Sequence, residues 1–138
     1  PPRSTLFPYT TLFRSTHGAF SWSELMTTDP VKAKAFYAAL LGWTLEEAPM
    51  GHTHYTLIKV GETPVGGIMG IPPGAPEGMP PSWGVYVTVD DVDAAAKKAA
   101  ELGGNVCVPP TDIAGVGRFC VIADPQGAVV SLITYVAK

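Results

Sequence analysis

Hydrophobic and polar positions along the chain form a pattern that occurs twice. The stretch Trp22–Asp29 alternates as a half-buried strand does, and Gly84–Asp91, 62 residues later, alternates in the same way. Each stretch ends on an aspartate, a residue suited to cap a helix. A helical pattern follows both times and stops at glycine, Gly42 in the first copy and Gly103 in the second. The pattern therefore predicts a strand, a capped helix and a glycine stop in two copies.

Both predicted helices have apolar residues at helical spacing. Pro30 suits the first helical position of the first helix. Its apolar residues Phe36, Leu40 and Leu41 are spaced to share one face, which we expect to pack on the sheet. The second helix has a corresponding set, which consists of Val92, Ala95, Ala96, Ala99 and Leu102.

The segments after the helices also correspond, now 64 residues apart. Tyr55–Met69 predicts two strands around a turn at Gly61-Glu62, and Phe119–Ile133 predicts two strands around a turn at Asp124–Gly127. Five prolines and two glycines mark the stretch between the halves as an extended linker. We therefore predict an α+β fold of two tandem βαβββ modules, about 19–71 and 83–138, joined by a Pro-rich linker over 71–82. One module cannot cover both faces of its sheet, so we expect one incomplete barrel around a central cavity.

Composition narrows the class of protein. The 138 residues are 46% hydrophobic and 15% charged, which predicts one globular domain and excludes a disordered chain. The net charge is −3 without a basic cluster, so nucleic acid and anionic membranes are poor partners. The longest nearly apolar run, Gly127–Ala137, is too short to span a bilayer. The two cysteines, Cys107 and Cys120, are interpreted as buried thiols of a cytoplasmic protein.

The first sixteen residues differ from the rest. They lack helical or strand periodicity, and they repeat Thr-Leu-Phe at Thr5–Phe7 and Thr11–Phe13. The run resembles the translation of a DNA-sequencing adapter, so we expect residues 1–16 to be a non-native leader from assembled, metagenomic reads. The single domain then covers 17–138. Without Arg3 and Arg14, its net charge is −5.

The body of the chain resembles the vicinal oxygen chelate superfamily, which includes glyoxalase I, extradiol dioxygenases and bleomycin resistance proteins. It is most similar to a bacterial, glyoxalase-like branch. The resemblance implies the fold predicted above and, because members of the superfamily commonly pair, a homodimer. The motifs that carry it are Glu24-Leu25, Thr28-Asp29, Ala35–Tyr37, Leu41–Trp43, Val89–Asp93, Leu102–Gly104, Gly115–Phe119 and Asp124–Ala128.

Metal-dependent members of this superfamily carry one ligand on the first and one on the last strand of each module. Position by position, the resemblance places these ligands at Trp22, Gly67, Gly84 and Ser131. A catalytic metal needs about three imidazole, carboxylate or thiolate groups, and none of these four residues supplies one. We therefore expect no metal and no cofactor.

Glu24 is the most informative polar residue. By alternation it shares a face with Trp22 and Met26, so we expect its carboxyl group to point into the cavity. Desolvation there would disfavour the ionised form and would suit a general base. The alternative is a buried glutamate that is satisfied by a backbone or tyrosine partner and only braces the sheet. Its equivalent in the second module is Tyr86, which shares a face with Thr88. We expect Glu24 and Tyr86 to meet across the cavity, as a hydrogen-bonded or an acid/base pair.

Two further residues have alternative interpretations. His54, in His52-Thr53-His54, is a solvated strand end, a pocket-edge residue or a metal ligand. Arg118, in a glycine-rich approach to a strand, contacts either a ligand carboxylate or a surface acid such as Asp112 or Asp124.

Two functions follow from these observations. The first is metal-independent binding of a small aromatic or polyketide-like ligand, neutral or cationic, in the cavity. The second is an enzyme, a glyoxalase-like lyase or isomerase or a dioxygenase-like protein, either with Glu24 as general base and Tyr86 as its partner or with relocated metal ligands. The predicted ligand-binding residues are Trp22, Glu24, His54, Tyr86, Thr88, Arg118 and Ser131.

Overall fold

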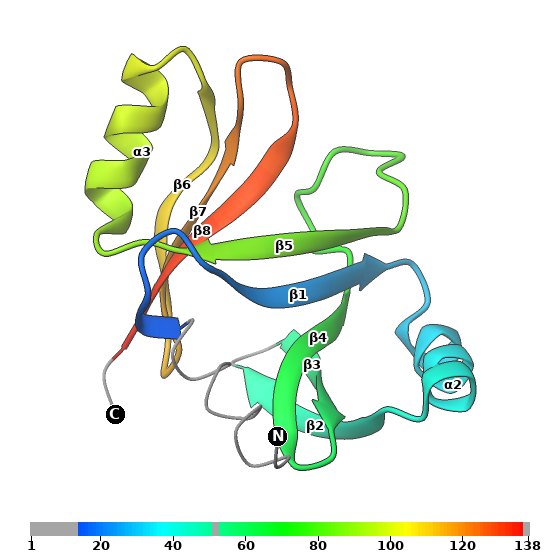
Figure 1. Ribbon diagram of the computed structural model, residues 1–138. Coiled ribbons are helices and arrows are strands. Elements are labelled where there is room, and N and C mark those ends of the chain that lie inside the picture. The colour runs from blue at the N-terminus through cyan, green and yellow to red at the C-terminus, as the bar shows by residue number, and fades with distance from the viewer. Residues whose placement is uncertain (1–13, 51–52, 137–138) are drawn as a thin grey trace. The chain divides into compact units, whose positions relative to one another are not determined.

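The computed structural model describes residues 14–50 and 53–136 (Figure 1). It divides into two compact units, Ser23–Gly84 (the α2 unit) and residues 14–22 with 85–136 (the α3 unit). Most of residues 1–16, the predicted leader, lie outside the described residues. The elements in chain order are β1 (Phe20–Thr27), α2 (Pro30–Leu41), β2 (Thr44–Met50), β3 (Thr53–Val60), β4 (Thr63–Gly70), β5 (Ser82–Thr88), α3 (Val92–Glu101), β6 (Asn105–Ile113), β7 (Gly117–Ala123) and β8 (Val129–Tyr135).

The two units have the same strand topology. In the α2 unit the order is β2-β3-β4-β1, with β1 parallel to β4 and the other pairs antiparallel. In the α3 unit the order is β6-β7-β8-β5, with β5 parallel to β8 and the other pairs antiparallel. Strand, helix and three strands thus occur twice, which confirms the predicted α+β fold of βαβββ modules. The sheets are open, with β2 and β6 at their edges.

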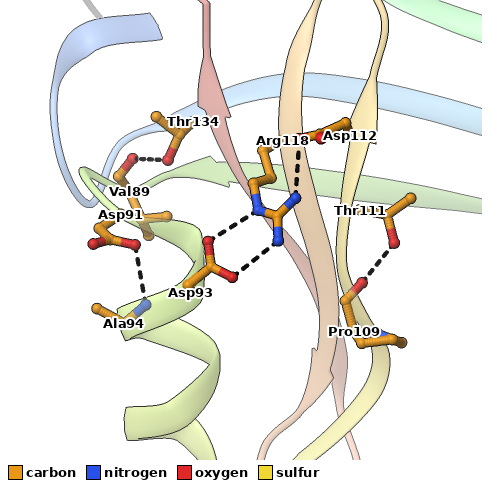
Figure 2. Close-up of polar contacts among 9 residues, drawn as sticks. All are labelled: Val89, Asp91, Asp93, Ala94, Pro109, Thr111, Asp112, Arg118 and Thr134. Carbon is orange, nitrogen blue, oxygen red and sulfur yellow. Dashed lines mark hydrogen bonds and ion pairs between the residues drawn. The ribbon is translucent and has the colours of Figure 1, made fainter.

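Local sequence signals determine where the helices begin and end. Asp29 Oδ1 accepts a hydrogen bond from the backbone N–H of Lys32 at 3.0 Å. Asp91 Oδ1 accepts one from the N–H of Ala94 at 3.1 Å (Figure 2). Both predicted caps are confirmed, and each satisfies a donor that the first turn of a helix leaves free. Gly42 ends α2 in the left-handed conformation, with φ of 71°, as glycine does without strain.

Each helix packs on one face of its own sheet. The buried core of the α2 unit consists of Leu25, Ile58 and Ile68, with Ala33 and Tyr37 of α2 packed against it. The core of the α3 unit consists of Val89, Val92, Ala96, Cys120 and Leu132. Since neighbouring residues of a strand point to opposite faces, these cores also define the faces that lie away from the helices.

The prediction of which residues of α2 pack on the sheet is wrong. Phe36, Leu40 and Leu41 are exposed, at 59%, 62% and 52% of their surface. The helix meets the sheet through Ala33 and Tyr37 instead. These two residues also stand four apart on one face, and the small alanine allows the helix to approach the strands closely. The larger apolar residues therefore remain on the outside of the unit.

The expectation that both cysteines are buried is wrong for one of them. Cys107 is exposed, whereas Cys120 is buried as expected. On β6 the half-buried Val106 and Val108 flank Cys107, so strand alternation turns the thiol to solvent. His52, of the predicted His52-Thr53-His54 strand end, is outside the described residues. In the described part of the chain, no helix is both long and apolar enough to cross a membrane.

Candidate functional site

Glu24 and Tyr55 form a buried polar pair in the α2 unit. Leu25 belongs to the core beneath α2, so Glu24, its neighbour on β1, points to the opposite face of the sheet. The hydroxyl group of Tyr55 on β3 donates a hydrogen bond to Glu24 Oε1, with an O···O distance of 2.7 Å. Only 7% of Glu24 and 6% of Tyr55 is exposed. Burial of both groups is tolerable because the carboxyl group and the phenol satisfy one another.

Gly67 makes room for this pair. It lies on β4 directly opposite Glu24 on β1, in parallel register. A Cβ atom at position 67 would overlap the hydroxyl and ring atoms of Tyr55. The phenol therefore occupies the space that any larger residue at position 67 would need, and glycine in the middle of a strand allows this close approach.

The same geometry recurs in the α3 unit with different chemistry. Tyr86 on β5 lies opposite Ser131 on β8, as Glu24 lies opposite Gly67. The ring of Tyr86 is 6.4 Å from that of Phe119, centroid to centroid, and tilted by 55°. Phe119 corresponds to Tyr55 in the 64-residue repeat. A carboxyl–phenol pair in one unit thus corresponds to two aromatic rings in the other.

The predicted site residues are distributed over several environments. Tyr86 and Thr88 are buried on β5, and Ser131 lies beside them on β8, so these three occupy one face of the α3 unit. Trp22 is half-buried on β1. His54 is exposed on β3. Their roles in ligand binding remain predictions.

All three guanidinium nitrogens of Arg118 donate hydrogen bonds to carboxylates. Its Nε and Nη2 donate to the two carboxylate oxygens of Asp93 at 2.9 and 3.0 Å, and its Nη1 donates to Asp112 Oδ1 at 3.0 Å (Figure 2). Hydrogen bonds from Arg118 lower the pKa of Asp93, and the two carboxylates raise the pKa of Arg118 in turn. The three groups line a pocket of about 450 Å³ in the α3 unit. The surface-acid interpretation, with Asp112 as partner, accounts for this arrangement.

The residues at the positions expected to hold a metal do not fit one. The phenol of Tyr55 fills the space beside Gly67, and Trp22 and Gly84 offer no side-chain donor for a divalent cation. Among residues 14–50 and 53–136, no three or more histidine, cysteine, aspartate or glutamate side chains are grouped so that they could hold a metal ion.

Tyr55 is the residue of this site that the sequence did not single out. A signal for it was present in Gly66-Gly67, because glycine inside a strand often marks a place where another group approaches closely. The identity of that group depends on the register between β3 and β4, which the pattern of single strands does not contain.

Comparison with known proteins places these features in a family context. The profile of the Glyoxalase/Bleomycin resistance protein/Dioxygenase superfamily matches residues 19–132. The chain is 44% identical over 117 residues to CFP32 of Mycobacterium bovis, which carries a provisional glyoxylase name. It is 35% identical over 124 residues to the anthracycline biosynthesis protein DnrV of Streptomyces peucetius. The matches cover 83% and 80% of this chain but only 45% of each relative, so the chain spans less than half of their length.

Solved structures show the same fold at low sequence identity. Methylmalonyl-CoA epimerase from Mycobacterium tuberculosis matches with a TM-score of 0.64 and 16% identity. The match covers 87% of this chain and 89% of the epimerase. At this identity the likeness concerns the fold alone.

Proposed function

The chain belongs to the Glyoxalase/Bleomycin resistance protein/Dioxygenase superfamily, and from that premise we propose that it is a metal-independent small-molecule-binding protein. The observation that carries the proposal is the Glu24–Tyr55 pair. It stands beside Gly67, where metal-dependent members are expected to place a ligand, and the phenol fills the space of that ligand. A hydrogen-bonding carboxyl group thus replaces a metal ligand as the polar feature of this face.

The ligand that suits this site is a small aromatic or polyketide-like molecule, neutral or cationic. The negative net charge disfavours anions, and the carboxyl group of Glu24 offers an acceptor to a hydroxyl or ammonium group. Tyr86 and Phe119 supply aromatic surface on the corresponding face of the α3 unit. The name of the relative DnrV, an anthracycline biosynthesis protein, supports the polyketide class.

A second candidate function is catalysis by the same pair. The 2.7 Å contact between Tyr55 Oη and Glu24 Oε1 joins a potential proton acceptor to a phenol that can reposition or return a proton. Such a pair suits an isomerase or a glyoxalase-like lyase that moves a proton next to a carbonyl group. The two functions predict different effects of the same substitution.

The test combines a binding measurement with an activity measurement on Glu24→Gln. Dihydroxyanthraquinone serves as the aromatic probe, followed by quenching of tryptophan fluorescence. The hemithioacetal of methylglyoxal and glutathione serves as the substrate of the lyase assay. For a binding protein we expect probe affinity to fall about three- to tenfold, about 0.7–1.4 kcal/mol, with no turnover in either protein. For an enzyme we expect turnover to be lost while probe affinity changes little.

Glu62→Gln is the matched control, because it makes the same chemical change at an exposed turn of the same unit. It should leave probe affinity at the wild-type value. If the wild-type protein binds no anthraquinone, or if both glutamine variants bind it equally well, the role of Glu24 in ligand binding is wrong.

We also propose a homodimer whose interface includes the exposed apolar side chains of α2, here called the α2 patch (Val31, Phe36, Leu40 and Leu41). All four are largely exposed, and exposed large apolar residues concentrated on one element are typical of an interface. Sedimentation of the wild type as a dimer and of Leu40→Lys as a monomer would support the dimer, and a monomeric wild type would contradict it.

A further inference from the structure

A guanidinium group lies over two aromatic rings of the α3 unit. The Cζ atom of Arg14 is 4.5 Å from the ring centroid of Tyr135 and 5.9 Å from that of Trp22. Both distances lie within the range in which the negative face of an aromatic ring attracts a cation. Trp22 belongs to β1 and Tyr135 to the end of β8. Two strands thus present a pair of rings to one positive charge.

The rings are held by the sheet, not by the cation. The hydroxyl groups of Tyr135 and Ser21 share a hydrogen bond of 2.9 Å, and Ser21 is buried beside Trp22 on β1. The backbone just before β1 is tied to β5, because Gly18 donates to the carbonyl of Thr88 at 2.7 Å. The Tyr135 hydroxyl and the backbone that leads into β1 therefore have partners other than Arg14.

Arg14 does not pair all of its hydrogen-bond donors when it lies over these rings. Its Nε atom is buried and has no hydrogen-bond partner in the described part of the chain. A guanidinium carries five N–H donors, and a donor that is buried without an acceptor costs stability. A quaternary ammonium group has the same charge and no N–H donor, so it gains the attraction of the rings without that cost.

We propose that Trp22 and Tyr135 form a binding subsite for an organic cation of the quaternary ammonium type, and that Arg14 occupies this subsite in the free chain. The cation competes with an internal group, so its apparent affinity is reduced by the fraction of molecules in which Arg14 covers the rings. The subsite refines the ligand class of the proposed function and rests on that function for its biological ligand. Its test, however, needs only a simple cation.

Choline is the probe, and dimethylbutanol is its neutral carbon isostere. Binding is followed by the indole N–H signal of Trp22 in nitrogen-edited NMR spectra, assigned with Trp22→Phe. We expect Arg14→Ala to bind choline about tenfold more tightly than the wild type, and to bind dimethylbutanol at least tenfold more weakly than choline. Lys97→Ala, which removes one exposed positive charge elsewhere, should bind choline as the wild type does.

Two variants of Tyr135 separate the ring from the fold, each made together with Arg14→Ala. Tyr135→Phe keeps the ring and loses the bond to Ser21, so choline affinity should stay within about threefold. Tyr135→Leu removes the ring, so choline affinity should fall at least fivefold while circular dichroism still reports a folded protein. Equal affinity for choline and dimethylbutanol, or equal choline affinity of the wild type and Arg14→Ala, would overturn the proposal. Either result is independent of whether the wild type binds the anthraquinone.

Discussion

Replacement of Gly67 by alanine is a severe test of the packing around Glu24. The added Cβ atom would overlap the phenol of Tyr55, so either the tyrosine or strand β4 must move. Overpacking of this kind costs about 1–3 kcal/mol. Displacement of the phenol also weakens its hydrogen bond to Glu24 without abolishing it, at a further cost of about 1–2 kcal/mol. We expect Gly67→Ala to lower the free energy of unfolding by about 2–5 kcal/mol, a large share of the 5–15 kcal/mol typical of a domain.

Urea denaturation followed by circular dichroism measures this loss, with an unchanged slope as evidence that the unfolded state is the same. In a thermal scan the loss corresponds to a fall in Tm of about 6–15 °C for a chain of this size. Gly84→Ala is the matched control, because Gly84 is also a strand glycine but nothing lies within 4 Å of its added Cβ. Its free energy of unfolding should change by less than about 0.5 kcal/mol.

A double-mutant cycle identifies the clash itself. Once Tyr55 is alanine, the space beside position 67 is empty, so Gly67→Ala should cost almost nothing in that background. If Gly67→Ala is as stable as the wild type, or if it costs as much with Ala at position 55 as with Tyr, the account of this site is refuted.

Three further predictions concern the α3 unit. Ellman's reagent should titrate one thiol in the native protein and two after unfolding, because Cys107 is exposed while burial raises the pKa of the Cys120 thiol. If both thiols of the native protein reacted rapidly, the burial of Cys120 would be contradicted. Asp91→Ala removes the cap of α3 and should lower the free energy of unfolding by about 0.5–2 kcal/mol in a urea titration, whereas no change would show that the cap is dispensable. Arg118→Ala should raise the pKa of Asp93 towards its ordinary value of 3.8. The stability that this lowered pKa provides is present when the pH is above the ordinary pKa of Asp93, and it is lost as the pH falls through the lowered pKa. The free energies of unfolding of wild type and variant should therefore differ at pH 7 and converge in acid. A difference that persists in acid would mean that Arg118 stabilises the protein through packing instead.

The internal repeat made the fold predictable. Equivalent residues 62 and 64 positions apart imply equivalent strand pairs, and the structure has Glu24 opposite Gly67 where it has Tyr86 opposite Ser131. Helix caps were predictable as well, because a cap depends on residues only three apart in sequence. These signals are local or duplicated, so one chain contains them in full.

Other features depend on contacts between segments and were therefore not predictable. The exposed position of Leu40 depends on which of two apolar stripes of α2 meets the sheet, and the stripe with the small Ala33 fits closer. The contact of Tyr55 with Glu24 depends on the register of three strands. Alternation separated the face of Glu24 from that of Leu25, which packs beneath α2, but it could not name the partner of Glu24.

The phenol that fills the space beside Gly67 also constrains how the protein can evolve. A substitution that introduced a larger side chain at position 67 would meet the ring of Tyr55, so the new residue would arrive in a destabilised protein. The order of changes that avoids this clash begins with a smaller residue at position 55, and that change removes the hydrogen bond to Glu24. Positions 55 and 67 are therefore coupled, and neither is free to change without a cost at the other.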